Sequence, residues 1–245
     1  MTMKKTTYII WMIVLCFLFA LIAPYFLYIL KVIFVPKNGG YFGQEKYFFW
    51  SFVGVMAYAI SRFLIKSKSR FLETFSHEAT HTLVAFLFRR KVHSFHVEDS
   101  GSGMIFTSGN NNYSLIPVAL APYNLPICTY LLLSIRFLIN DNGLWLYDIL
   151  VGITICFHFY CFKTQIGNHQ TDINQYPLSF SYTYILVSWI INLCIILPSF
   201  FPNMNGDETA SPPIYYYGVW SCMSRLVTEC WNNLICYFNL IGLWS

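Results

Sequence analysis

The stretch FLETFSHEATHTLVAFLF, residues 71–88, is an apolar segment whose polar residues gather in its first half. At 1.5 Å per residue it predicts a helix about 27 Å long, just enough to cross the hydrocarbon of a membrane. His77 and His81 are four residues apart, so a helix brings both imidazoles to one face, where they can reach one metal ion. Glu78 projects about 100° around the helix, beside the metal, where its carboxylate can accept a proton from metal-bound water.

This HExxH pattern, His77-Glu78-Ala79-Thr80-His81, is typical of zinc metalloproteases. The competing interpretation is a chance match on a buried helix whose histidines are hydrogen-bonded within the core. Two histidines and a glutamate are costly to bury in an apolar helix without partners, and ionisable groups inside a membrane usually serve a function. We therefore expect one catalytic Zn²⁺ ion at His77 and His81, with Glu78 as the general base.

A hydrolytic zinc site usually takes three protein ligands and leaves the fourth position to water. The third ligand must then come from another part of the chain. Asp172 is the preferred candidate, because it lies in the polar segment 163–176 between two apolar runs. His169, three residues earlier, is an alternative, and the other candidates are Glu73, His93 and His96. Glu73 could instead orient the His77 ring from one helical turn away.

The composition of the whole chain indicates a membrane protein. Of its 245 residues, 56% are hydrophobic and only 11% are charged, less than half the charged share of an average soluble domain. The net charge of +4 arises from short basic clusters at the ends of apolar runs, a pattern that sets membrane orientation. Nucleic acid is not expected as a partner, since no polar basic segment is interleaved with aromatic residues. The eight cysteines form no CxxC pair, so a disulfide framework is not expected.

The apolar runs predict an all-α polytopic membrane protein with about six membrane helices. The expected spans are 8–35, 47–65, 71–88, 115–139, 144–162 and 181–201. The last segment, 215–245, carries one polar stripe, which predicts a helix that lies in the membrane interface or packs its stripe inward. We treat 1–245 as a single integral membrane metalloprotease domain. Its expected parts are the N-terminal spans (1–70), a catalytic core (71–180) and a C-terminal span with an amphipathic helix (181–245).

Residues 92–110 change to strand-like residues around a Ser-Gly-Ser-Gly sequence at 100–103, which predicts a β-hairpin. If Asp172 is a zinc ligand, the hairpin must be re-entrant, because the number of spans otherwise leaves Asp172 across the membrane from His77. Such backbone is tolerated where protein shields it or where it lines a water-filled cavity. An exposed strand edge could hold an extended substrate, and a lid or structural plug is the alternative. The candidate substrate-binding residues on this edge are Met104, Ile105 and Phe106.

Four features together resemble the site-2 protease family of intramembrane zinc metalloproteases. They are the motif helix, the turn Glu98-Asp-Ser-Gly-Ser-Gly103, the span that begins with Ile116-Pro-Val-Ala-Leu-Ala-Pro-Tyr123, and the later Thr171-Asp172. The likeness is to the compact bacterial branch without a PDZ domain, and it covers roughly residues 70–180. It implies that His77, His81 and Asp172 bind zinc, that Glu78 is the general base, and that the substrate is a membrane-associated polypeptide.

The sequence thus predicts an intramembrane zinc metalloendopeptidase, and the expected location is the bacterial inner membrane. The expected partners are a membrane protein substrate and the lipid bilayer, and the oligomeric state is not predicted. Two other functional classes stay open. A non-catalytic zinc-binding scaffold or inactive homologue would have four protein ligands around its ion. A membrane transporter would carry ionisable groups along several of its spans.

Overall fold

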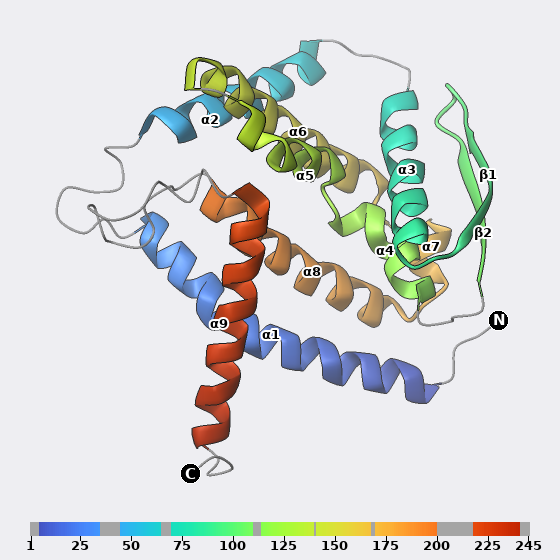
Figure 1. Cartoon of the computed structure of the whole chain (residues 1–245). Helices are drawn as coiled ribbons and strands as arrows, with labels where there is room; N and C mark the ends of the chain where they lie inside the picture. The colour runs from blue at the N-terminus through green and yellow to red at the C-terminus, as the bar shows by residue number, and fades with distance from the viewer. Residues whose placement is uncertain are drawn as a thin grey trace.

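The computed structural model describes residues 5–34, 45–64, 70–109, 114–139, 141–167, 170–199 and 218–240. Its elements in chain order are α1 (Lys5–Phe34), α2 (Glu45–Leu64), α3 (Phe71–Leu87), β1 (Lys91–Val97), β2 (Gly103–Ser108), α4 (Leu115–Asn124), α5 (Ile127–Ser134), α6 (Leu144–Gln165), α7 (Thr171–Asn174), α8 (Leu178–Ser199) and α9 (Gly218–Leu240) (Figure 1). Two single-turn 3-10 segments, Arg136–Leu138 and Asp141–Gly143, connect α5 to α6. The expected helical fold with one small β-hairpin is confirmed.

Three of the described helices are long and apolar enough to cross a membrane: Tyr8–Lys31 in α1, Leu144–Gln165 in α6 and Leu178–Leu197 in α8. The pair α4 and α5 makes a fourth candidate span if it is counted as one broken helix. About six spans were expected. The difference comes from α2, whose apolar part Phe49–Leu64 is short, and from α3, which has 17 residues and carries the charged motif. The described part of the chain is therefore a multi-pass membrane protein with three or four candidate spans.

The expected single span 115–139 is broken between α4 and α5, which meet at 81°. The break lies at Leu125, whose φ of −101° and ψ of 104° are extended rather than helical. Leu125 precedes Pro126, and the proline ring disfavours the helical conformation of the residue before it. Asn192 of α8 donates a hydrogen bond of 2.9 Å to the Asn124 carbonyl at this break. The bend separates α4, which packs against the motif helix, from α5.

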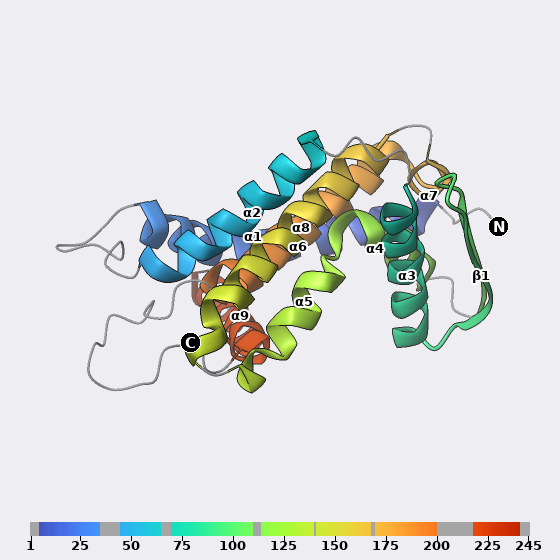
Figure 2. The ribbon, with the colours of Figure 1, turned by 90° about the horizontal axis from the view of Figure 1, so that it is seen from above.

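Helices α2 and α6 pack along each other with their backbones in close approach (Figure 2). A Cβ atom added at Gly54 of α2 would overlap the backbone carbonyl of Ile149, and one added at Gly152 of α6 would overlap that of Ser51. Small residues at such crossings allow membrane helices to pack by van der Waals contact. This packing fixes the position of α6, whose last residue lies at the candidate site.

Helix α9 packs against α1 (Figure 1) through side chains of its last turns. In the predicted polar stripe, Arg225 and Glu229 are half-buried and Asn232 is exposed. Pro24 within α1 has no N–H, so the carbonyl of Ala20 has no intrahelical donor. The Tyr237 hydroxyl of α9 donates to this carbonyl at 3.1 Å, and Asn233 donates to the neighbouring Leu21 carbonyl at 2.7 Å. The first and last described helices are thus joined where a proline interrupts the hydrogen bonding of α1.

The β-hairpin lies beside α3 at one edge of the molecule (Figure 1). Its strands are antiparallel and in register from Lys91 opposite Ser108 to Val97 opposite Gly103, with an irregularity near the start of β1. Phe95 of β1 packs edge-on against Phe75 of α3, with ring centroids 5.8 Å apart. The turn lies at 98–102, close to the expected Ser-Gly-Ser-Gly sequence. The hairpin therefore lies along the helix that carries the motif.

Candidate metal centre

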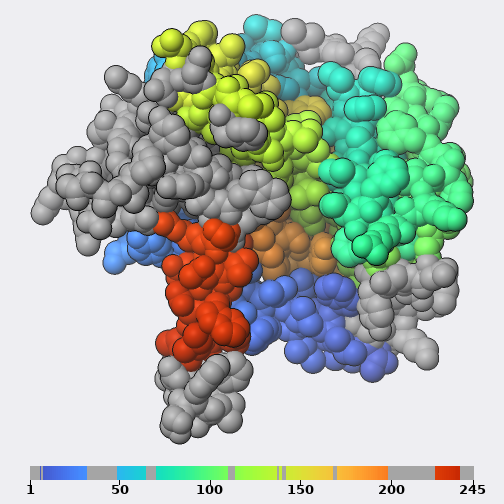
Figure 3. Space-filling model, in the orientation of Figure 1, coloured from blue at the N-terminus to red at the C-terminus, as the bar shows by residue number. Residues whose placement is uncertain are grey.

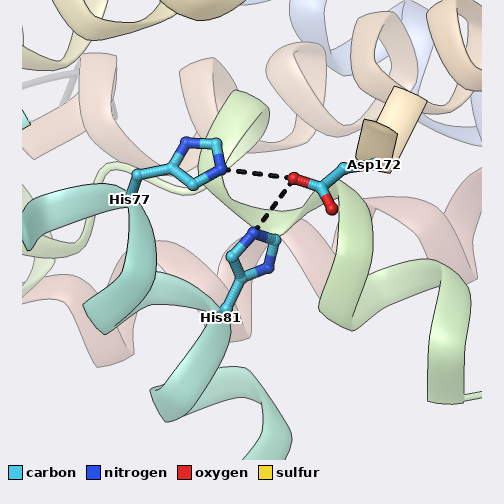
Figure 4. Close-up of side chains that lie close together, drawn as sticks. All are labelled: His77, His81 and Asp172. Atoms are coloured by element: carbon cyan, nitrogen blue, oxygen red, sulfur yellow. Dashed lines mark hydrogen bonds and ion pairs between the residues drawn. The ribbon is translucent and has the colours of Figure 1, made fainter. Parts of the chain in front are cut away.

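His77 and His81 lie one turn apart on the buried face of α3, with 8% and 5% of their surface exposed. The Nε2 atom of each ring is 3.3 Å from Oδ2 of Asp172, and the dashed lines in Figure 4 mark both contacts. The possible ligand atoms of the three residues all lie within 4.8 Å of one another. Within the described ranges of the chain, no other group of three His, Cys, Asp or Glu side chains could hold a metal ion.

Asp172 reaches the histidines from α7, the four-residue helix between α6 and α8. Its neighbour Ile173 is fully buried in an apolar cluster with residues of α4 and α8, and the Ile173 carbonyl accepts a 3.0 Å hydrogen bond from Ser181 Oγ. Burial alone would raise the pKa of Asp172. A proton or a cation between the two rings and Asp172 would outweigh that effect and lower the pKa, because positive charge stabilises the carboxylate.

The outer nitrogen of each imidazole is held by an oxygen that can only accept a hydrogen bond. Nδ1 of His81 donates to the Val118 carbonyl of α4 at 2.7 Å. Nδ1 of His77 donates to Oε1 of Gln165 at 3.0 Å. The Gln165 amide has this orientation because its Nε2 donates to the Glu73 carbonyl at 3.3 Å. Both rings therefore carry a proton on Nδ1, which leaves Nε2 as the nitrogen that can bind a metal ion beside Asp172.

This arrangement fits a bound cation. When the imidazoles are neutral, each Nε2 lone pair faces a carboxylate oxygen at 3.3 Å, and two acceptors this close repel each other unless positive charge lies between them. Two imidazole nitrogens and one carboxylate oxygen are a common ligand set of hydrolytic zinc. Hydrogen bonds from the outer nitrogens to oxygen atoms are also the usual support of zinc-binding histidines. The donor set and its supports thus match a divalent metal such as zinc.

A cavity of about 420 Å³ opens beside these three side chains. Its lining is mainly polar and comes from α3, the hairpin turn and β2, the end of α6, and α7. Glu78, which is 7% exposed, lies in this lining next to the histidines. The backbone of β2 comes so close that a Cβ atom added at Gly103 would lie 2.7 Å from Glu78 Oε1 and 2.6 Å from Thr74 Cγ2. The hairpin therefore restricts where the Glu78 carboxylate can lie.

Glu73, an alternative third ligand, is engaged elsewhere. Its Oε1 pairs with Arg62 of α2 at 2.9 Å. The same Arg62 nitrogen donates to the Tyr160 hydroxyl of α6 at 2.6 Å, and the guanidinium lies over that ring. The expectation that the Glu73 carboxylate could orient His77 is wrong, because only its backbone carbonyl takes part, through Gln165.

The two hairpin histidines are also remote from the cluster. His93 is exposed and contacts Ser108 Oγ at 2.6 Å, and His96 is exposed and pairs with Glu98 at 3.1 Å. Hydrogen bonds from His96 and Ser100 lower the pKa of Glu98. His169 lies outside the described residues. Among the candidates that the structure describes, Asp172 alone joins the motif histidines.

The three residues expected to bind substrate all belong to β2. Met104 and Ile105 line the cavity, whereas Phe106 is not among its lining residues. The side chains of Met104 and Phe106 are exposed, and Ile105 is half-buried. β1 contributes no lining residue, so the edge of β2 that is not paired with β1 borders the cavity among the described strands.

The comparisons with known proteins found one match, to a family model. Residues 48–166 match the family model described as Peptidase M50B-like. The match covers just under half of the chain and shows what this region is similar to. The match includes α3 with its motif, the hairpin, α4, α5 and all of α6, and it supports the resemblance to site-2 proteases. No curated protein and no solved structure matches the chain. The described residues thus form a multi-pass membrane protein in which the region around the motif is similar to a peptidase family.

Sequence reasoning missed the residues that orient the two rings. Gln165 lies at the end of an apolar span, where a polar side chain is ordinary, and Val118 acts through its carbonyl, which no side-chain pattern reveals. The polar character of 163–176 was a signal for Asp172, and it could have drawn attention to Gln165 as well.

Proposed function

We propose that this protein is a zinc-dependent intramembrane endopeptidase in which His77, His81 and Asp172 hold one Zn²⁺ ion and Glu78 is the general base. The observation that carries the proposal is the convergence of two Nε2 atoms on one carboxylate oxygen, each ring fixed by a hydrogen bond at Nδ1. Three protein ligands among the described residues favour a catalytic site over a purely structural one, which would use four.

Zinc, when bound, would supply a Lewis acid that polarises a peptide carbonyl and lowers the pKa of a coordinated water. The contribution of Glu78 follows from its position in the cavity lining beside both histidines. Its carboxylate takes one proton from the attacking water and delivers it to the nitrogen of the leaving amine, so the general base of the first step becomes the general acid of the second. The polar lining provides room for that water next to Glu78.

The substrate proposed is the polypeptide of a membrane protein, bound in extended form. A helix hides its backbone carbonyls in hydrogen bonds, so a segment must unwind before cleavage. The unpaired edge of β2 offers backbone donors and acceptors along the cavity, and the hairpin forms an outer flank beside α3 (Figure 3). Addition of a substrate strand to this edge would hold the scissile bond near Glu78. Met104, Ile105 and Phe106 are the proposed contacts, in a hairpin that we propose to be re-entrant and to border the water-filled cavity.

The ligand and base roles predict different effects on zinc and on cleavage. Zinc content is measured by elemental analysis of purified protein, and cleavage with quenched-fluorescence transmembrane peptides in liposomes. The His81→Ala and Asp172→Ala variants should lose both zinc and cleavage. The Glu78→Gln variant should keep its zinc and lose cleavage by about 10²-fold or more, as expected for a general base. The His93→Ala variant, altered at an exposed hairpin residue, is the matched control and should keep both.

Two results would contradict the proposal. Cleavage by Glu78→Gln at the wild-type rate would remove the base role. Zinc-loaded wild-type protein that cleaves no member of a broad peptide set would instead support a scaffold that binds zinc without catalysis.

A further inference from the structure

Tyr123 is a fully buried residue of α4 whose ring stands edge-on to the ring of His77, with centroids 5.4 Å apart. Its backbone is held firmly, because its carbonyl accepts a 2.9 Å hydrogen bond from the Trp189 indole of α8. The ring packs in an apolar cluster with Ile116 and Ile173, the latter next to Asp172. The phenol is therefore fixed between the motif helix and α7, without freedom to turn toward lipid.

The Tyr123 hydroxyl makes no well-formed hydrogen bond within the described ranges of the chain. A buried hydroxyl without a partner is costly, so one that persists in a core usually has an acceptor in the working state of the protein. The charges of Asp172 and Glu78 act on this hydroxyl, and Asp172 also comes within range of a long, weak interaction with it. Tyr123 does not line the cavity, so a substrate is not the missing acceptor.

The Asp172 carboxylate has the required acceptor. Its Oδ2 faces both imidazole nitrogens, whereas Oδ1 has no hydrogen bond within the described residues. In Figure 4 the second oxygen points away from the two rings. A carboxylate that binds a metal through one oxygen is commonly hydrogen-bonded at the other, and this second bond fixes its orientation.

We propose that Tyr123 is a positioning residue for the metal centre: its hydroxyl donates to the outer oxygen of Asp172 when the ion is bound. This inference rests on the proposed zinc site. The bond would orient Asp172 so that its inner oxygen coordinates the ion, and it would supply the hydroxyl with the acceptor that it lacks. The role needs only the phenolic oxygen, because the ring alone already fills the space beside His77.

The test is the zinc affinity of Tyr123→Phe, which removes only that oxygen, measured by competition with a chelator of known affinity on the full chain in detergent. The affinity should fall about 10-fold, the lower end of the effect of removing such supporting bonds. The melting temperature of the zinc-free variant should be no lower than that of zinc-free wild type, because the hydroxyl has no acceptor there. Tyr184→Phe changes a tyrosine in the second turn of α8 and is the control, which should leave zinc affinity unchanged.

A double-mutant cycle tests whether the effect passes through Asp172. In an Asp172→Asn background, Tyr123→Phe should cause no further loss of zinc affinity. Three results would each overturn the inference. They are an unchanged zinc affinity of Tyr123→Phe, a lower melting temperature of zinc-free Tyr123→Phe, and an equal loss of zinc affinity in the wild-type and Asp172→Asn backgrounds. Zinc affinity does not depend on turnover. If Tyr123→Phe binds zinc as tightly as the wild-type protein and the wild-type protein cleaves its substrate, only the role of Tyr123 is rejected. If the wild-type protein binds zinc tightly but does not cleave, only the proposed activity is rejected.

Discussion

Gly103→Ala is expected to impair catalysis without removing the metal. The added methyl group would lie 2.7 Å from Glu78 Oε1, 2.8 Å from Glu78 Cγ and 2.6 Å from Thr74 Cγ2. To restore an ordinary contact of 3.4 Å, the carboxylate must retreat by about 0.7 Å, and a displacement of about 1 Å in a catalytic group can cost 10²-fold in rate. We therefore expect kcat to fall roughly 10- to 100-fold. Zinc content should stay at the wild-type level, because Glu78 is not a proposed ligand.

The assay is cleavage of a transmembrane peptide in liposomes, with zinc content and thermal unfolding measured on the same preparations. Gly109→Ala is the matched control, since it also adds one methyl group to the hairpin. Its nearest neighbour is Arg90 Cγ at 3.2 Å, and it should leave the rate nearly unchanged. A wild-type rate for Gly103→Ala would refute the idea that β2 restricts Glu78. Loss of zinc would show that the substitution acts by distorting the whole site.

Other parts of the structure lead to three further predictions. Gln165→Leu removes the acceptor of the His77 Nδ1 proton and should weaken zinc binding about 10-fold or more. Gln165→Glu keeps an acceptor and should largely restore the zinc affinity. Equal zinc affinities of Gln165→Leu and the wild-type protein would contradict this role of Gln165. Gly152→Ala forces α2 away from α6 and should lower the free energy of unfolding by about 1–3 kcal/mol. The control Leu150→Ala, on the exposed face of α6, should lower it by less. Thermal unfolding in detergent measures both. Tyr237→Phe should cost about 0.6 kcal/mol, the average for hydrogen bonds between membrane helices, and an unchanged melting temperature would argue against the contact with Ala20.

The sequence predicts those parts of the site that depend on a single helix. The spacing of His77 and His81 places both rings on one face of any helix, so their proximity follows from helical geometry alone. The placement of Asp172 needed an additional argument, namely that the polar segment after α6 must return to the motif. The structure brings Asp172 to the histidines, while its role as a ligand remains a proposal.

The features that sequence analysis missed depend on contacts between distant segments. The Arg62–Glu73 pair joins α2 to α3, and neither residue has a pattern that indicates the other. The carbonyl of Val118 can act on His81 only because α4 packs against α3. The break at Leu125 had a local signal in the following proline, but the strong hydropathy of 115–139 favoured one continuous span. Hydropathy measures suitability for lipid and does not report whether a helix is straight.

The link between α1 and α9 has a consequence for biogenesis. While α1 enters the bilayer during synthesis, the Ala20 carbonyl opposite Pro24 faces hydrocarbon without a donor, and its partner Tyr237 is more than two hundred residues from being translated. An unsatisfied carbonyl in lipid is unfavourable, so the early helix is expected to stay near water, a chaperone or the insertion machinery until α9 arrives. Completion of the first helix would then be among the last events in the assembly of this protein.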